Sequence, residues 1–142
     1  MKPGRKPRLL CAGPKVMILS DSNIFIIDRF FPRDVHYSIN KRFIEMLPRL
    51  DGAISIYNLL EICGLASFNL TAGELAEWFH HFDRVYGLKV LLPINLEAHT
   101  VKQFWQDWLS EIYRLFTRKM TFIDAATLAI AESYHVSHLV TW

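Results

Sequence analysis

Lys15-Val16-Met17-Ile18-Leu19-Ser20, followed at once by Asp21-Ser22-Asn23, is the most informative stretch of this 142-residue sequence. A short and continuously apolar run is typical of a strand that is covered on both faces, as in a parallel sheet. The polar triplet ends the run, and residues 24–31 then predict a helix that stops before Pro32. The stretch therefore predicts a buried strand with a carboxylate at its end, leading directly into a helix.

The same alternation continues along the rest of the chain. Further strands are predicted at 53–56, 89–93 and 138–142, and Asp51-Gly52 is expected to break the chain before the first of them. Helices are predicted at 38–50, 57–66, 72–82 and 96–118, and a last helix runs from Asp124, its expected cap, to Tyr134. Strands separated by helices imply a parallel sheet covered on both faces. The predicted fold is a three-layer α/β/α sandwich with a central parallel sheet of four to five strands.

Composition restricts the class of protein. A chain of 142 residues is most simply one domain, and 51% hydrophobic with 21% charged residues exclude an intrinsically disordered protein. No apolar stretch approaches the roughly 18 residues of a membrane-spanning helix. The two cysteines, Cys11 and Cys63, show no metal-ligand spacing, and no secretory signal is present. These features predict a protein of a reducing compartment, the cytoplasm.

The net charge of +2 conceals a division of the chain. Residues 1–15 contain five basic and no acidic side chains, whereas the remaining 127 residues contain 11 basic and 14 acidic ones. Residues 1–14, with three prolines and two glycines, are predicted to be a basic, disordered tail, and residues 15–142 form the domain. The tail is interpreted either as a solvated leader or as a segment that contacts nucleic acid.

Three acidic residues are candidates for chemistry. The site of an open parallel sheet lies beyond the carboxyl ends of its strands, so Asp21, Glu61 and Asp124 are expected to meet at one edge. Asp21 and Asp124 can equally be explained as helix N-caps. Glu61 lies in an apolar segment, where an isolated charge is costly, and it therefore needs a basic partner or a metal ion.

Convergence of these carboxylates would determine the chemistry of the site. Two like charges about 4 Å apart repel by about 4 kcal/mol at an effective dielectric constant near 20. The cluster would therefore bind a cation or take up protons. Oxygen ligands alone favour Mg²⁺ or Mn²⁺ over Zn²⁺, and such an ion can activate water against a phosphodiester.

Three segments, in order, resemble the PIN-domain family, to which the VapC toxins belong. They are 16–26 (VMILSDSNIFI), 54–64 (ISIYNLLEICG) and 122–131 (FIDAATLAIA), the last followed by 138–142 (HLVTW). The resemblance implies a metal-dependent endoribonuclease, a hydrolase of RNA phosphodiester bonds, acting as the toxin of a toxin–antitoxin pair. In this family the residues that match Asp21, Glu61 and Asp124 ligate one or two Mg²⁺ or Mn²⁺ ions. The expected partners are an RNA substrate, an antitoxin protein and a second copy of the chain.

The resemblance also suggests supporting residues, and the sequence departs from the family pattern at one point. Ser22, Asn23 and Thr141 would orient the carboxylates and water, and Arg118 and Lys119 are either phosphate contacts or a solvated helix end. The family places a further Asp or Asn shortly after the residue matching Thr141, but the sequence stops at Trp142. A last strand is therefore expected to be missing. A catalytically silent PIN-like module that binds RNA or protein remains an alternative.

Other features have simpler explanations. A phosphatase with Asp21 as its nucleophile would need a second Asp where Asn23 stands, which disfavours that class. Trp78, Phe79 and Phe82 predict either core packing or an exposed patch for self-association or for an antitoxin helix. Trp105 and Trp108 are predicted to be core residues. Glu77 and His81 are one helical turn apart, as a metal pair would be, but no third ligand has suitable spacing, which favours a surface pair.

Overall fold

The computed structural model describes residues 16–142 and contains a parallel sheet of four strands. The strands are β1 (Met17–Ser20), β2 (Asp51–Ser55), β3 (Lys89–Leu91) and β4 (His138–Val140), in the order β3-β2-β1-β4. Every neighbouring pair is parallel. The predicted α/β fold with a parallel sheet is confirmed. The predicted tail, residues 1–14, lies outside the described residues.

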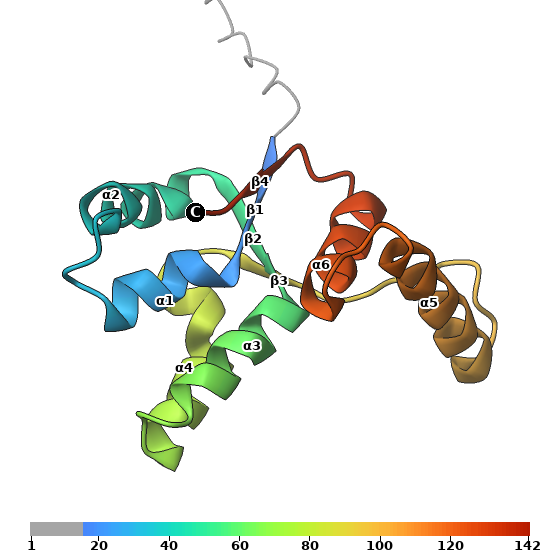
Figure 1. Ribbon diagram of the computed structural model, residues 1–142, viewed down its shortest axis with the longest axis horizontal. Coiled ribbons are helices and arrows are strands. Elements are labelled where there is room, and N and C mark those ends of the chain that lie inside the picture. The colour runs from blue at the N-terminus through green and yellow to red at the C-terminus, as the bar shows by residue number, and fades with distance from the viewer. Residues whose placement is uncertain (1–15) are drawn as a thin grey trace, which may run out of the picture.

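Helices flank the sheet (Figure 1). They are α1 (Ser22–Phe30), α2 (Tyr37–Met46), α3 (Ile56–Ala66), α4 (Ala72–Tyr86), α5 (Val101–Phe116) and α6 (Phe122–Ser133), with one turn of 3-10 helix at Leu47–Arg49. Figure 1 shows α1, α2 and α4 on one side of the strands and α5 and α6 on the other. Helix α3 contacts α1 and α4 as well as α6, so it joins the two sides.

The strand order creates a switch point beside β1. The chain proceeds outward from β1 through β2 to β3, and then returns to place β4 on the opposite edge of β1. Ser20 pairs with Val140, and the amide of Asp21 donates a hydrogen bond of 2.9 Å to the carbonyl of Val140. Because ligand sites of open α/β sheets lie where the strand order reverses, this geometry points to the carboxyl ends of β1 and β4.

The main hydrophobic core lies among α1, α3 and α4. Phe25 of α1 makes near-perpendicular contacts with Phe82 and Tyr86 of α4, at ring-centroid distances of 4.9 and 4.8 Å. Trp78 and Phe82 are almost fully buried, so the aromatic stripe on α4 is core, as the first of its two interpretations predicted. On α5, in contrast, Trp105 is 49% exposed, which contradicts its prediction as a core residue, whereas Trp108 packs against the α5–α6 cluster.

Two element boundaries differ from the predictions for identifiable reasons. Asp51 and Gly52 begin β2 and do not break the chain, because they pair with Met17 and Ile18 of β1. A Cβ at Gly52 would lie 3.0 Å from a methyl of Leu47, so the glycine allows the 3-10 turn at Leu47–Arg49 to pack closely against β2. Helix α4 continues past Phe82 to Tyr86, where Gly87 ends it in a left-handed conformation (φ 62°).

The last two helices also begin at other residues than predicted. Helix α5 starts at Val101 and not at 96, because the side chain of Thr100 caps it by accepting from the amide of Gln103. Helix α6 starts at Phe122 with Thr121 as its cap, so the prediction that Asp124 caps this helix is wrong. Among residues 16–142, no helix is both long and apolar enough to cross a membrane.

Candidate active site

A cleft of about 420 Å³ opens at the carboxyl end of β1 and contains all three predicted carboxylates. Asp21 stands between β1 and α1, Glu61 is on α3, and Asp124 is on α6. The rest of the lining comes from Ser22, Asn23, Ile26, Thr121, Phe122 and Ile123. The topology therefore brings residues that are 40 and 63 positions apart in the sequence to one cleft.

Asp21 is held by hydrogen bonds to both of its carboxylate oxygens. Its Oδ1 accepts from the amide of Ser22 at 2.7 Å and from Nδ2 of Asn58 at 3.1 Å. Its Oδ2 accepts from the hydroxyl of Thr141 at 2.7 Å. Asp21 is thus the N-cap of α1, as one interpretation predicted, and it lines the cleft as well. The cap fixes the carboxylate where the other two acids can approach it.

Ser22 connects Asp21 to Glu61. Its hydroxyl donates to Oε2 of Glu61 and lies 3.2 Å from Oδ1 of Asp21. The apolar sequence around Glu61 implied a basic partner or a cation, and the structure supplies no basic partner. In the described part of the chain, none of the ion pairs involves Asp21, Glu61 or Asp124. Among residues 16–142, the negative charge of the cleft is consequently not neutralised by an ion pair.

Asp124 stands apart from the other two acids. It is the third residue of α6 and is exposed, and its Oδ2 accepts from the hydroxyl of Thr121 at 2.7 Å. Within residues 16–142, no three His, Cys, Asp or Glu side chains lie close enough together to hold a metal ion. The cleft therefore gathers the three carboxylates without placing them in a common coordination geometry.

The donor set nevertheless fits a hard divalent cation. All three acids offer oxygen, the type of ligand that Mg²⁺ and Mn²⁺ prefer. Asn23 also lines the cleft, and its Oδ1 is buried and has no hydrogen-bond partner. Its Nδ2 group is already used, donating to the hydroxyl of Thr141 at 3.1 Å and to the carbonyl of Trp142 at 3.0 Å. Asn23 and Thr141 thus both border the carboxylates, and Thr141 contacts Asp21 directly.

A buried polar network centred on Asn58 holds Asp21 in position, and the sequence pattern did not identify Asn58 as a site residue. Asn58 is 1% exposed, and its Oδ1 accepts from the hydroxyls of Ser55 at 2.6 Å and Thr127 at 2.7 Å. With its oxygen engaged in this way, the Nδ2 group is directed at Asp21 and Ser22. A possible signal was the Ser-x-x-Asn spacing at the end of a buried strand, since Ser55 caps α3 through the amide of Asn58.

The last two residues pack beside the cleft. The indole nitrogen of Trp142 donates to Oδ1 of Asn40 at 2.7 Å, and its ring stacks on His36 at 4.9 Å. Asn40 is fully buried and donates to the carbonyl of Ile24 at 2.7 Å. The carboxyl end of the chain accordingly lies near α2 in Figure 1. These contacts hold Thr141 against Asp21.

Other predicted residues lie away from the cleft lining. Arg118 and Lys119 are exposed in the turn that connects α5 to α6. Glu77 and His81 approach to 3.8 Å on the surface of α4, and no third metal ligand joins them among the described residues. Burial raises the pKa of the Cys63 thiol, which keeps it protonated and makes it a poor nucleophile.

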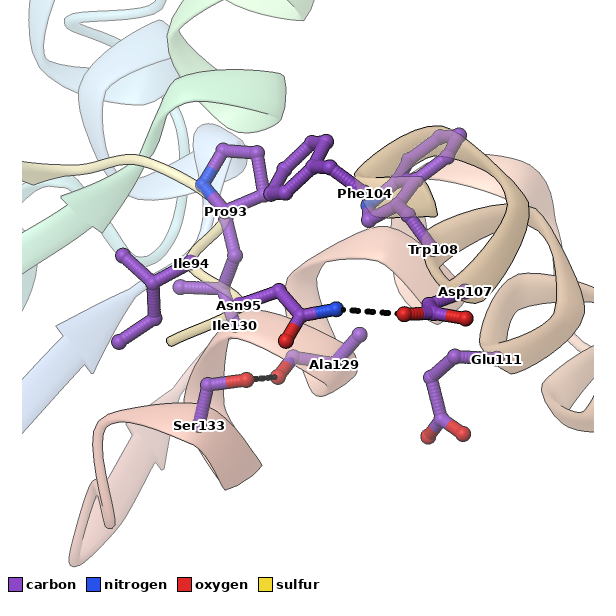
Figure 2. Close-up of a pocket in the computed structure, with 10 residues that line it drawn as sticks. All are labelled: Pro93, Ile94, Asn95, Phe104, Asp107, Trp108, Glu111, Ala129, Ile130 and Ser133. Carbon is purple, nitrogen blue, oxygen red and sulfur yellow. Dashed lines mark hydrogen bonds between the residues drawn. The ribbon is translucent and has the colours of Figure 1, made fainter. Parts of the chain in front are cut away.

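A second, smaller pocket of about 190 Å³ lies between α5, α6 and the segment after β3 (Figure 2). Its walls include Phe104 and Trp108, and Asn95 donates to Asp107 across it at 2.9 Å. The other acid there, Glu111, is paired with Arg114. With one carboxylate bound to an amide and the other to a guanidinium, this pocket lacks the unbalanced charge of the cleft.

A solved structure provides the comparison for this geometry. VapC20 of Mycobacterium tuberculosis, described as a toxin that cleaves the sarcin-ricin loop, superposes with a TM-score of 0.63 over 88% of each chain, at 14% sequence identity. The chain has a PIN-like fold. No protein-family profile and no curated protein sequence matches it significantly. At 14% identity the likeness to VapC20 concerns the fold, and the activity has to be argued from the cleft.

Proposed function

We propose that this chain is an endoribonuclease that depends on a divalent metal ion, Mg²⁺ or Mn²⁺, held by Asp21, Glu61 and Asp124. One observation carries the proposal: three carboxylates from separate elements line a cleft at the switch point of a PIN-like sheet, and within residues 16–142 no basic side chain forms an ion pair with them. Repulsion among such groups favours the binding of a cation.

Some residues of the site carry negative charge, and others hold these carboxylates in position. A bound divalent ion would supply activation of water and would offset the charge of the phosphodiester. Asn58 and Thr141 hold the two oxygens of Asp21, and Ser22 holds Glu61 near it. The Asp124 side chain accepts a hydrogen bond only from Thr121 and is the most exposed of the three. It is therefore the carboxylate that can turn most freely toward the other two.

The biological role is proposed from the likeness to VapC20. Since that protein is described as a toxin, we infer a toxin role for this chain, with RNA as its substrate and an antitoxin protein as its partner. A cytoplasmic location accords with this role and with the sparse use of cysteine.

The test is cleavage of an end-labelled panel of structured RNAs with Mn²⁺, with EDTA, and with Asp21→Asn. Asparagine also caps helices well, so this variant keeps α1 while removing the charge. We expect cleavage to need Mn²⁺ and to fall by about 100-fold or more in the variant, the equivalent of about 3 kcal/mol of barrier. Asp83→Asn, on the exposed surface of α4, is the matched control and should cut like the parent.

Cleavage by Asp21→Asn at the rate of the parent would refute the assignment and indicate a contaminating nuclease. The second candidate function, an RNA- or protein-binding module without catalysis, is favoured by the separation of Asp124 from the other two acids. Titration of the parent with Mn²⁺, followed by water proton relaxation, distinguishes the two. The nuclease binds Mn²⁺ and loses that binding in Asp21→Asn, whereas the silent module binds no Mn²⁺ at the cleft.

A further inference from the structure

One wall of the cleft presents an aromatic ring. Phe122, the first residue of α6, lines the cleft next to Thr121 and Asp124 and is 45% exposed. Single exposed apolar side chains are ordinary at protein surfaces. Phe122 differs from most of them because it belongs to the lining of the cleft that contains the carboxylates.

The ring of Phe122 is fixed in place. It meets Tyr57 at a centroid distance of 5.9 Å with an interplanar angle of 78°, and Trp108 at 6.1 Å with an angle of 76°. Tyr57 and Trp108 themselves stack at 5.8 Å. Two aromatic neighbours on other helices thus hold the ring while almost half of its surface remains open. A rigid aromatic surface binds a planar partner at little cost in conformational entropy.

Positive charge lies immediately before this ring in the sequence. Arg118 and Lys119 are exposed in the α5–α6 turn and take part in none of the ion pairs found in residues 16–142. Proteins bind unpaired nucleic acid by stacking bases on aromatic rings and holding the phosphates with cations. The α5–α6 turn supplies two exposed cations close in sequence to the ring.

We propose that Phe122 is a stacking platform for one unpaired base of the RNA strand that lies in the cleft. The inference rests on the proposed function for the identity of the ligand and adds a specificity-determining residue to it. Stacking on Phe122 would fix the position of the strand relative to Asp124, two residues further along α6. It would also select a strand whose base is free to leave its neighbours.

The test uses a short unpaired RNA that carries a single 2-aminopurine, placed in turn at each position, with EDTA present to prevent metal-dependent cleavage. Quenching of 2-aminopurine emission reports stacking, and fluorescence anisotropy of an end label reports binding. We expect the parent to quench one position. Phe122→Leu should abolish this quench and weaken binding by about 5- to 150-fold, the range that corresponds to the loss of one base–aromatic contact.

Three variants separate stacking from structure. Phe122→Leu keeps apolar volume against Tyr57 and Trp108, and Phe122→Trp should restore both quenching and affinity. Phe68→Leu is the matched control, because Phe68 is 87% exposed and does not line the cleft. Equal quenching by the parent and Phe122→Leu, or no binding of RNA by the parent, would overturn the inference. Binding and quenching without cleavage in Mn²⁺ would leave the platform in place and refute the nuclease.

Discussion

On one side of the sheet, α1, α3 and α4 are held together by a cluster of buried aromatic rings, Phe25, Trp78, Phe82 and Tyr86. On the other side, α5 and α6 meet through Ile112 and Leu115 and three alanines, Ala125, Ala126 and Ala129. The first arrangement buries large rings of α1 and α4 together with the smaller apolar side chains of α3. The second leaves a long apolar side of α5 in contact with solvent, at Val101, Trp105, Leu109, Tyr113 and Phe116.

This difference matters for the cleft, which lies where the two sides meet. Asp21 caps α1 and Glu61 is on α3, and both of these helices contribute to the large core, whereas Asp124 is on α6. The polar link between the sides runs through Thr127, which donates to Asn58. The position of Asp124 relative to the other acids is therefore set by the more lightly packed side. That explains how the three carboxylates can share a cleft and still stand apart.

The largest effect on the free energy of unfolding is expected when one tryptophan from each side is replaced in turn. Trp78→Ala removes a buried ring that contacts Phe30 and Phe82, and should lower the free energy of unfolding by about 3–5 kcal/mol. Trp105→Ala removes a ring that is 49% exposed and should cost less, about 1–2 kcal/mol. Urea unfolding followed by circular dichroism measures both. Equal losses would contradict the unequal packing of the two sides.

A smaller effect is expected at the link between the sides. Thr127→Val keeps the shape of the side chain and removes the hydroxyl that donates to Asn58, which should destabilise the fold by about 1–2 kcal/mol. Asn58 then loses one of the two donors that orient its amide toward Asp21. We expect RNA cleavage, on the proposed function, to fall by about 10- to 100-fold.

Thr117→Val is the matched control for Thr127→Val. Its hydroxyl donates to the carbonyl of Arg114 at the exposed end of α5, far from the network of Asn58. Stability and cleavage should both stay close to those of the parent. If Thr127→Val behaves like this control, the hydroxyl does not link α6 to the carboxylates.

The sequence predicts the side of the sheet that holds Asp21 and Glu61 better than the side formed by α5 and α6. The run of Met17 to Ser20, the carboxylate after it and the acid on α3 all follow from local pattern and strand topology. Asn58 could not be assigned in the same way, because its role depends on which hydroxyls approach it from β2 and α6. Thr121 and Asp124 are both residue types that favour helix N-caps and lie three positions apart, so local preference does not decide which of them begins the helix.

The exposed side of α5 was missed for a related reason. A helix with apolar residues over a wide arc predicts burial of that whole arc. Here α6 covers only the part that contains Ile112 and Leu115, so Trp105 stays half exposed. How much of an apolar face is covered depends on the partner helix, and the sequence of one helix does not contain that information.

The pH dependence of stability should depend on Tyr86, which is buried in the core beside α1. Burial and the nearby Asp28 carboxylate raise the pKa of Tyr86 above its ordinary value near 10. The neutral form is thus favoured in the folded state, and this stability is present below pH 10 and is lost as the pH rises further. Above pH 10 the free energy of unfolding should fall by about 1.4 kcal/mol per pH unit through this residue.

Tyr86→Phe should remove this part of the decline, and Tyr113→Phe on the exposed side of α5 should retain it. The pKa values of Cys63 and Tyr57 are also raised, so a background decline of the same sign remains in both variants. Urea unfolding between pH 8 and pH 11 gives the slopes. Parallel curves for the parent and Tyr86→Phe would show that Tyr86 ionises as readily in the folded as in the unfolded chain.

The smallest effect is expected on the outer side of α5. Leu109 is 57% exposed, and Leu109→Gln should change the free energy of unfolding by no more than about 0.5 kcal/mol. Leu115→Gln places an amide at a fully buried position of the same helix and shows how much a covered site would lose in stability.

Both variants are measured by urea unfolding at a low and a high protein concentration. A partner that binds only the folded chain raises the apparent stability of that chain, and the increase grows with the concentration of the partner. A loss at Leu109 that grows with protein concentration would therefore show that a second copy covers this side of α5. Self-association would then use α5, because Trp78 and Phe82 of α4 are already buried within the chain.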